Sequence, residues 1–260
     1  MEITLKNINS GYSEIVLENI NLEIKKGTWN FIVGKTGSGK STLLQTIGFL
    51  LTNIQGEIFW KDLSLADLKN LKKYRENIGF MFQYTDKQFF NNTVKEEIIY
   101  SLVKKKKSLK EIEEKLEEVL NLLKISKNIL QNSPYEISGG QKRMVAFASI
   151  LIDSPKILLL DEPTAGLDVE NKKIFFETLE KLKKEGVTIL QISHLLEDVL
   201  DYGDETIVLE NRKIIQKGKP IDVLKNSDLE FIRFCRVIEK YGIPIDNIKN
   251  IDELLERIKK

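Results

Sequence analysis

Short stretches of strand length, some alternating between apolar and polar residues and some mostly apolar, occupy the first third of the chain. A period of two is typical of strands that bury one face, and turn residues separate the stretches here. The pattern predicts strands over residues 2–6, 20–24, 29–33, 56–60 and 77–82. We therefore expect the chain to begin with β-structure.

Further along, the period of the apolar residues changes to between three and four. Val94, Ile98 and Leu102 are spaced by four residues, and a second series runs from 109 to 123 in steps of three and four. Such spacing lines one face of a helix. We expect two amphipathic helices within a helical insertion. The lysine run 104–107 between them is interpreted as a solvated helix end, with contact to anionic lipid as the alternative.

Strands and helices alternate through the rest of the main body. The pattern predicts a helix after Ser138, a strand over 156–161, a helix over 169–185, a strand over 187–192 and a hairpin near 205–216. The segment 156–161 is almost wholly apolar, as expected of a parallel strand covered on both faces. This alternation indicates an α/β domain, followed by a mostly helical tail.

Composition restricts the class of protein. Lys and Arg total 40 against 39 Asp and Glu, a net charge of +1, which provides no field for attracting nucleic acid. The one cysteine, Cys235, permits no intramolecular disulfide and is interpreted as a buried packing residue in a reducing compartment. The first residues lack a signal-peptide core, and no apolar run reaches the roughly 18 residues of a membrane span. We expect a soluble protein that acts at any membrane through a partner.

The first candidate chemistry is a glycine-rich segment between a predicted strand and a predicted helix. It reads Gly34-Lys35-Thr36-Gly37-Ser38-Gly39-Lys40-Ser41-Thr42 and fits the phosphate-loop pattern G-x-x-x-x-G-K-[ST]. Backbone N–H groups and the helix N-terminus would together hold a polyphosphate. Lys40 would contact the β- and γ-phosphates, and the Ser41 hydroxyl would ligate Mg²⁺. An accidental glycine-rich turn is the alternative.

Two further motifs narrow the kind of nucleotide enzyme. Asp161 and Glu162 end an apolar strand, where Asp161 can hold Mg²⁺ and Glu162 can polarise the water that attacks the γ-phosphate. Alone, this pair would be interpreted as an acidic turn. The segment Ser138-Gly139-Gly140-Gln141 enters a helix and offers a second anion-binding N-terminus. Alone, it would be interpreted as a helix cap.

The order of these motifs, followed by Ala165-Gly166-Leu167-Asp168 and by His194, resembles the ATP-binding cassette (ABC) ATPases over residues 1 to about 218. The resemblance implies an α/β fold, a P-loop NTPase of the ABC type with a RecA-like core, an antiparallel β subdomain and a helical subdomain at about 93–152. Residues 219–260 would form a small C-terminal helical extension. ATP and Mg²⁺ are the implied cofactors, and ATP hydrolysis is the implied reaction.

The same resemblance assigns roles to single residues. Gly34–Thr42 is similar to the Walker A motif, Asp161 with Glu162 to Walker B and the catalytic glutamate, and Ser138–Gln141 to the signature motif. Asp168 would close the D-loop, and Tyr12 would stack on adenine unless it is a plain packing residue. The implied catalytic residues are Glu162, His194, Gln83 and Lys40. The implied Mg²⁺ ligands are Ser41, Gln83 and Asp161, with His194 also contacting the γ-phosphate.

A narrower resemblance lies in residues 82–94 and 138–146, which look like the ATPases of energy-coupling-factor importers of vitamins and metal ions. Thr85 and Asp86 depart from that family's Pro and Glu, and Met144 from a second arginine. The resemblance implies a head-to-tail dimer that sandwiches two ATPs, with the signature motif serving the other subunit's nucleotide. The second subunit would be a paralogue, with a homodimer as the alternative. A transmembrane coupling subunit and a substrate-binding membrane subunit would hold the chain at the cytoplasmic face of the membrane.

Other uses of such a cassette are less consistent with the chain. A DNA-maintenance ATPase would carry a very long coiled coil between Lys40 and Ser138, where no sustained heptads occur. A translation-type protein would carry two cassettes, and a module without turnover would lack Glu162 or His194. The ATPase of another ABC transporter, or a non-transport ABC ATPase, is therefore the second interpretation.

Residues 83–93 suggest how such an ATPase would contact a partner. A loop that exposes Phe89 and Phe90 together would be an apolar patch, which usually marks a docking surface. We expect a cytoplasmic helix of a transmembrane subunit to bind there. The alternative is that both rings fill the core of the helical insertion.

Overall fold

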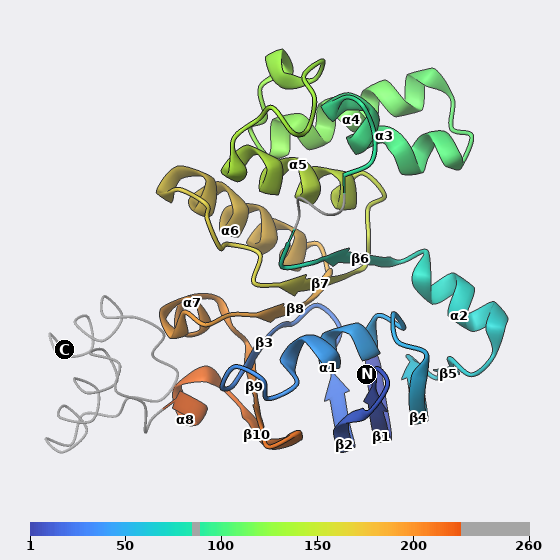
Figure 1. Ribbon diagram of the computed structural model, residues 1–260, viewed down its shortest axis with the longest axis vertical. Coiled ribbons are helices and arrows are strands. Elements are labelled where there is room, and N and C mark those ends of the chain that lie inside the picture. The colour runs from blue at the N-terminus through green and yellow to red at the C-terminus, as the bar shows by residue number, and fades with distance from the viewer. Residues whose placement is uncertain (85–88, 225–260) are drawn as a thin grey trace, which may run out of the picture.

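The N-terminal strands of the protein form an antiparallel sheet. The computed structural model describes residues 1–84 and 89–224. Within them, β1 (Ile3–Gly11), β2 (Ile15–Ile24), β4 (Asn53–Trp60) and β5 (Leu63–Ser64) pair in the order β2-β1-β4-β5. One face of this sheet is buried against helix α1 (Lys40–Ile47) (Figure 1).

The second sheet is mostly parallel and runs in the order β10-β9-β3-β8-β7-β6. Its strands are β3 (Trp29–Val33), β6 (Ile78–Met81), β7 (Ile157–Asp161), β8 (Thr188–Ile192), β9 (Glu205–Glu210) and β10 (Lys213–Gly218). Strand β10 is antiparallel to β9, and the other pairs are parallel. Every residue of β3, β7 and β8 is buried. The carboxyl ends of the parallel strands meet at one edge, where open α/β sheets bind their ligands.

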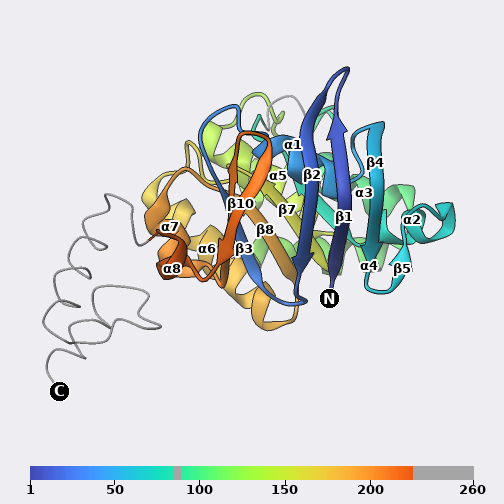
Figure 2. The same cartoon turned by 90° about the horizontal axis from the view of Figure 1, so that it is seen from below.

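Helices cover both faces of the parallel sheet. Helix α1 lies between the two sheets. On the other face, α5 (Gly139–Leu151), α6 (Val169–Lys184) and α7 (Leu196–Tyr202) lie nearest the sheet, and α3 (Val94–Lys104) and α4 (Leu109–Leu122) lie beyond α5 (Figure 1). Figure 2 shows the antiparallel strands on the near side and the helices α3, α4 and α5 behind the parallel sheet. None of the helices within the described ranges has the length and apolar character that a bilayer span requires.

Most elements lie within a few residues of their predicted positions, and the helices that were missed are polar or short. Strand β3 matches the predicted range, and α3 and α4 are the two amphipathic helices. Helix α2 (Leu68–Arg75) was not predicted, because half of its residues are Lys or Arg. Its start is fixed by the Asp67 side chain, which accepts hydrogen bonds from the amides of Lys69 and Asn70.

The predicted C-terminal tail is described only where it begins. A short helix, α8 (Pro220–Leu224), packs its buried side chains against the main body. The rest of the tail, with Cys235, lies outside the described residues, and so do Thr85 and Asp86. Lys104 ends α3, as expected for the lysine run.

Phe89 and Phe90 have opposite environments. Phe89 is buried among the helices, whereas Phe90 is 62% exposed. The expectation of a joint patch is therefore wrong for Phe89, and the expectation of a joint core position is wrong for Phe90. The cause is Glu97, a buried residue of α3 whose Oε2 accepts hydrogen bonds from the backbone N–H groups of Phe90 (3.2 Å) and Asn91 (3.0 Å). These bonds fix the backbone so that successive side chains point to opposite sides.

Candidate functional site

The phosphate loop joins β3 to α1 at the carboxyl edge of the parallel sheet. Gly34 and Gly37 have φ angles of 151° and 79°, which glycine adopts readily and other residues rarely do. At Gly34, a Cβ atom would lie 2.1 Å from the carbonyl oxygen of Leu209 on β9. Because backbone cannot yield there without moving the sheet, glycine is required at this position.

The Lys40 ammonium group lies inside the loop. Its Nζ donates to the carbonyl oxygens of Gly34 (2.8 Å) and Lys35 (3.0 Å), and Lys40 is only 7% exposed. Burial lowers the pKa of Lys40, while the negative charges of Glu162 and Asp161 act in the opposite direction. A desolvated cation within a ring of backbone amides can bind a polyphosphate strongly.

A buried hydroxyl in the same loop lacks a hydrogen-bond partner. Ser38 is 7% exposed, and its Oγ makes no hydrogen bond with any of the residues that the structure describes. Buried polar atoms are normally paired, so an unpaired one in a binding loop indicates a group that a ligand would satisfy. Of the neighbouring loop residues, Lys35 and Thr36 are exposed and Thr42 is buried.

Ser41 and Asp161 form a set of hard oxygen donors beside this loop. Burial raises the pKa of Asp161 above its usual range, and a hydrogen bond with the Ser41 side chain opposes that increase. A hydroxyl and a carboxylate next to a phosphate loop match the preference of Mg²⁺ for oxygen ligands. These two residues therefore fit the ion that the sequence implies.

Glu162 is the centre of a cluster of polar side chains drawn from three segments. Gln83, which follows β6, donates from Nε2 to Glu162 Oε2 at 3.1 Å. His194, which follows β8, places Nε2 2.8 Å from Glu162 Oε1. Glu162 itself has a φ of 48°, a conformation that a residue with a side chain keeps only when its surroundings enforce it. The structure thus brings Gln83, Glu162 and His194 together with Lys40 and Asp161.

The segment Ser138–Gln141 starts helix α5 with a capping box. Ser138 Oγ accepts from the Gln141 amide (3.3 Å), and Gln141 Oε1 accepts from the Ser138 amide (2.9 Å). The Ser138 hydroxyl and the backbone N–H groups of Ser138 and Gln141 are therefore engaged within the helix start itself. The amides of Gly139 and Gly140 stay unpaired by the helix, as first-turn amides do. A Cβ atom at Gly139 would meet nothing within 4 Å, so this helix start faces open space.

Asp168 and Tyr12 are exposed residues held by single partners. Asp168 caps α6, because its carboxylate accepts from the backbone (2.8 Å) and side-chain (2.9 Å) N–H groups of Asn171. These bonds lower the pKa of Asp168.

Tyr12 lies in the turn between β1 and β2, is 53% exposed, and donates a hydrogen bond from its hydroxyl to Gln45 Oε1 of α1 at 3.0 Å. Its ring is therefore accessible to a planar ligand beside the phosphate loop.

Comparison with known proteins assigns this arrangement to a family. The family model described as "ABC transporter" matches residues 17–165, which is more than half of the chain. The chain belongs to the ABC transporter family.

Curated relatives narrow this assignment within the ABC transporter family. The energy-coupling factor transporter ATP-binding protein EcfA3 of Oenococcus oeni is 38% identical over 281 residues, covering 100% of this chain and 97% of the relative. EcfA2 of Ligilactobacillus salivarius is 36% identical, with 98% and 97% covered. The chain is therefore an ABC ATPase that binds and hydrolyses ATP, of the energy-coupling factor type.

Solved ABC structures confirm the fold class. CbiO1 from Clostridium perfringens, described as part of the ABC transporter complex cbiONQ, aligns with a TM-score of 0.77 and 31% identity, covering 92% of this chain and 98% of that chain. A dimeric ATP-binding cassette in a post-hydrolysis state with ADP and Pi aligns with a TM-score of 0.73 and 30% identity, covering 84% and 98%. The two-sheet architecture is thus that of an ABC cassette.

One residue of this ABC site was missed by sequence reasoning. Arg143 of α5 donates from one terminal nitrogen to the Glu162 carbonyl oxygen (2.7 Å) and from the other to the Gln83 carbonyl oxygen (2.9 Å). It immediately precedes five buried residues, Met144 to Ala148. A cation next to an apolar helical run is a signal that could have indicated this role, because a charged side chain near the core needs hydrogen-bond acceptors to replace the solvent that it loses.

Proposed function

We propose that this ABC ATPase drives an energy-coupling factor importer of a vitamin or metal ion, by ATP-dependent dimer closure coupled to a transmembrane partner. The observation that carries the proposal is the cluster of Gln83, Glu162 and His194 beside Lys40 and Asp161. Phosphoryl transfer depends on positioning and on charge placed around the γ-phosphate, and this cluster supplies both. The names of the curated relatives support the transporter class.

Each group in the cluster has a proposed task. The loop 34–42 would bind the phosphates, with Lys40 on the β- and γ-phosphates and Tyr12 against adenine. Ser41, Asp161 and Gln83 would hold Mg²⁺, which when bound neutralises charge on the phosphate oxygens. Glu162 would accept the proton of the attacking water, and His194, whose Nε2 lies 2.8 Å from Glu162 Oε1, would keep that carboxylate oriented.

The helix start at Ser138 is proposed to serve the nucleotide of a second ATPase subunit. A Cβ atom at Gly139 would meet nothing within 4 Å, whereas Gly140 lies beside Gly166 and Asn171, which flank Asp168. Within one subunit, the capping box leaves the amides of Gly139 and Gly140 unused. A solved relative of this fold is a dimer with ADP and Pi, which supports the arrangement. We propose a paralogous second subunit, with a homodimer as the alternative.

Ser138→Arg should prevent dimer closure. In the Glu162→Gln protein, measured alone and together with its paralogous subunit, ATP with Mg²⁺ should drive closed dimers that sedimentation detects. An arginine at Ser138 would place a long cationic side chain where the second subunit's phosphate must lie, so the monomer should persist at saturating ATP. Ser108→Arg is the matched control, because Ser108 forms the same capping box on α4. Closure in Ser138→Arg equal to that in Ser108→Arg would contradict the assignment.

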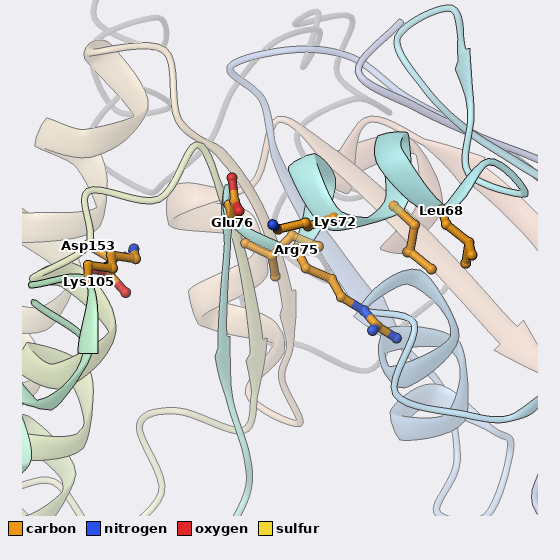
Figure 3. A pocket seen from close by; sticks show the side chains of 8 residues that line it. Leu68, Lys72, Arg75, Glu76, Lys105 and Asp153 are labelled. Atoms are coloured by element: carbon orange, nitrogen blue, oxygen red, sulfur yellow. Dashed lines mark hydrogen bonds and ion pairs between the residues drawn. The ribbon is translucent and has the colours of Figure 1, made fainter.

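The exposed ring of Phe90, in the predicted docking segment 83–93, and a groove beside edge strand β6 together form the proposed docking surface for a cytoplasmic helix of the transmembrane subunit. The groove has a volume of about 400 Å³, and its apolar lining comes from Leu68, Leu71 and Ile78. Figure 3 shows Lys105 and Asp153 on one side and the α2 side chains on the other. Helix α3 continues from this groove to the exposed ring of Phe90, whose edge contacts Tyr100 of α3 at 4.6 Å between centroids.

This docking arrangement completes the proposed assembly. We propose that the transmembrane coupling subunit and a substrate-binding membrane subunit hold the ATPase at the cytoplasmic face of the membrane. The cassette would span 1–218 with its helical subdomain at about 93–152, and 219–260 would be the C-terminal extension. Ligand-driven motion requires that ATP bind the closed dimer more tightly than the open one.

Phe90→Ala should uncouple transport from ATP hydrolysis. Removing an exposed ring that contacts the partner should lower uptake about tenfold while the ATPase activity of the purified subunits stays within about twofold. Uptake by membrane vesicles and ATPase activity would be measured in parallel. Leu109→Ala is the control, since Leu109 is an equally apolar residue of the helical layer with 80% exposure. Wild-type uptake by Phe90→Ala would show that the docking surface lies elsewhere on the protein. The membrane chains that co-purify with the ATPase would identify the transporter class.

A further inference from the structure

Arg143 connects three parts of the ATPase site through backbone atoms. Its guanidinium group donates to the carbonyl oxygens of Gln83 and Glu162, at 2.9 and 2.7 Å. The side chains of Gln83 and Glu162 also bond each other at 3.1 Å. Arginine donors have a fixed planar fork, so two simultaneous bonds restrain both the distance and the orientation of the two carbonyls. Arg143 therefore closes a ring of hydrogen bonds around the proposed base.

The restraint acts where the backbone needs it. Glu162 has a φ of 48°, and such a conformation costs free energy that the surroundings must offset. Bonds from a permanently charged donor are stronger than those between neutral groups. Only the amide of Ala165, at a longer 3.3 Å, is also bonded to the Glu162 carbonyl oxygen within the described part of the chain. Arg143 thus makes the shorter of these two contacts at the Glu162 carbonyl oxygen.

The helix that carries Arg143 begins at Ser138. A capping box fixes the start of α5, and Met144 to Ala148 are buried in the core, so the helix moves as one body. Its exposed end faces outward at Gly139, while its second turn holds Gln83 and Glu162. A displacement of the Ser138 end would therefore also shift the carbonyl groups of Gln83 and Glu162.

We propose that Arg143 is a positioning residue that connects the two ATP sites of the dimer. When Ser138–Gln141 engages ATP held by the second subunit, α5 shifts, and Arg143 carries that shift to the backbone of Glu162 and Gln83 in its own chain. Hydrolysis in this chain then requires engagement of its signature helix by the partner's ATP. The proposal rests on the proposed function, because it needs the closed dimer.

The test separates dimer closure from ATP turnover in the assembled ATPase pair. Arg143→Gln should still form ATP-dependent closed dimers, because Ser138 is intact, yet lose roughly 100-fold in kcat, the loss typical of a misplaced catalytic group. Its KM for ATP should change less than about threefold, since the phosphate loop is untouched. Arg143→Lys keeps the charge but offers a single point of donation, so its kcat should fall between that of Arg143→Gln and wild type. Lys142→Gln, one residue earlier on the same helix, is the control and should match wild type.

The outcomes are distinguishable. Wild-type kcat in Arg143→Gln would overturn the inference, and so would loss of closed dimers, which would place Arg143 in binding or folding. An equal loss of kcat in Arg143→Lys and Arg143→Gln would also overturn it, because a single hydrogen bond from lysine to these carbonyl oxygens would then have no effect on turnover. Two other variants, measured in the same assays, test the proposed function separately. If Glu162→Gln turns over ATP like wild type, or if Ser138→Arg closes normally, the proposed function fails irrespective of Arg143.

Discussion

Glu162→Gln should bind ATP and lose about 10²- to 10⁴-fold in turnover, the range expected when a general base is removed. The substitution keeps the shape of the side chain and replaces one acceptor oxygen by an amide donor. Gln83 and His194 approach the two carboxylate oxygens of Glu162, at 3.1 and 2.8 Å. After the substitution, the new amide donor would face one of these two nitrogens in place of an acceptor oxygen. The phosphate loop with Lys40 is unchanged, which is why affinity for ATP should be retained.

Two measurements check this expectation together. Steady-state release of phosphate reports turnover, and titration with ATP under conditions that permit binding reports affinity. Glu177→Gln is a matched control, because Glu177 is a surface residue of α6 outside the cluster. Wild-type turnover in Glu162→Gln would show that another group is the base. Loss of ATP binding would instead show that Glu162 acts in holding the nucleotide.

The phosphate loop and the parallel strands could be predicted because their determinants are local. Glycines with positive φ, a lysine and a hydroxyl residue occur in fixed order between a strand and a helix. The strand β7 was recognisable because it is buried on both faces and therefore apolar throughout. Within the described residues, the predicted members of the hydrolysis cluster, Gln83, Glu162 and His194, do lie together.

Other features depend on contacts between distant residues, which no local pattern carries. Helix α2 is stabilised at its start by Asp67 and has little apolar character, so periodicity could not detect it. The opposite environments of Phe89 and Phe90 follow from Glu97, a buried carboxylate on the next helix. Arg143 acts through two carbonyl oxygens, which every residue possesses. Bonds to backbone leave no residue-type signature at the acceptor, so sequence reasoning has nothing to detect there.

Lys40→Ala should weaken ATP binding by about 100-fold or more, because removal of a buried charge that pairs with a ligand typically costs several kcal/mol. Lys40 is 7% exposed, and its ammonium group is held by the carbonyl oxygens of Gly34 and Lys35. No other cation of the described chain is hydrogen-bonded to those two carbonyls. The remaining backbone amides would bind phosphate without the charge that balances it.

Without nucleotide, the stability of Lys40→Ala should change far less than its affinity for ATP. Burial lowers the pKa of Lys40 in the folded protein, so the charged form is disfavoured by folding at every pH below its ordinary pKa. Removing the side chain relieves that cost while losing two hydrogen bonds, and the melting temperature without nucleotide should stay within a few degrees of wild type. Added ATP should raise the melting temperature of wild type and of the surface control Lys26→Ala, because a ligand stabilises the state that binds it. Lys40→Ala should show no such rise, and a full rise would mean that the loop holds ATP without this cation.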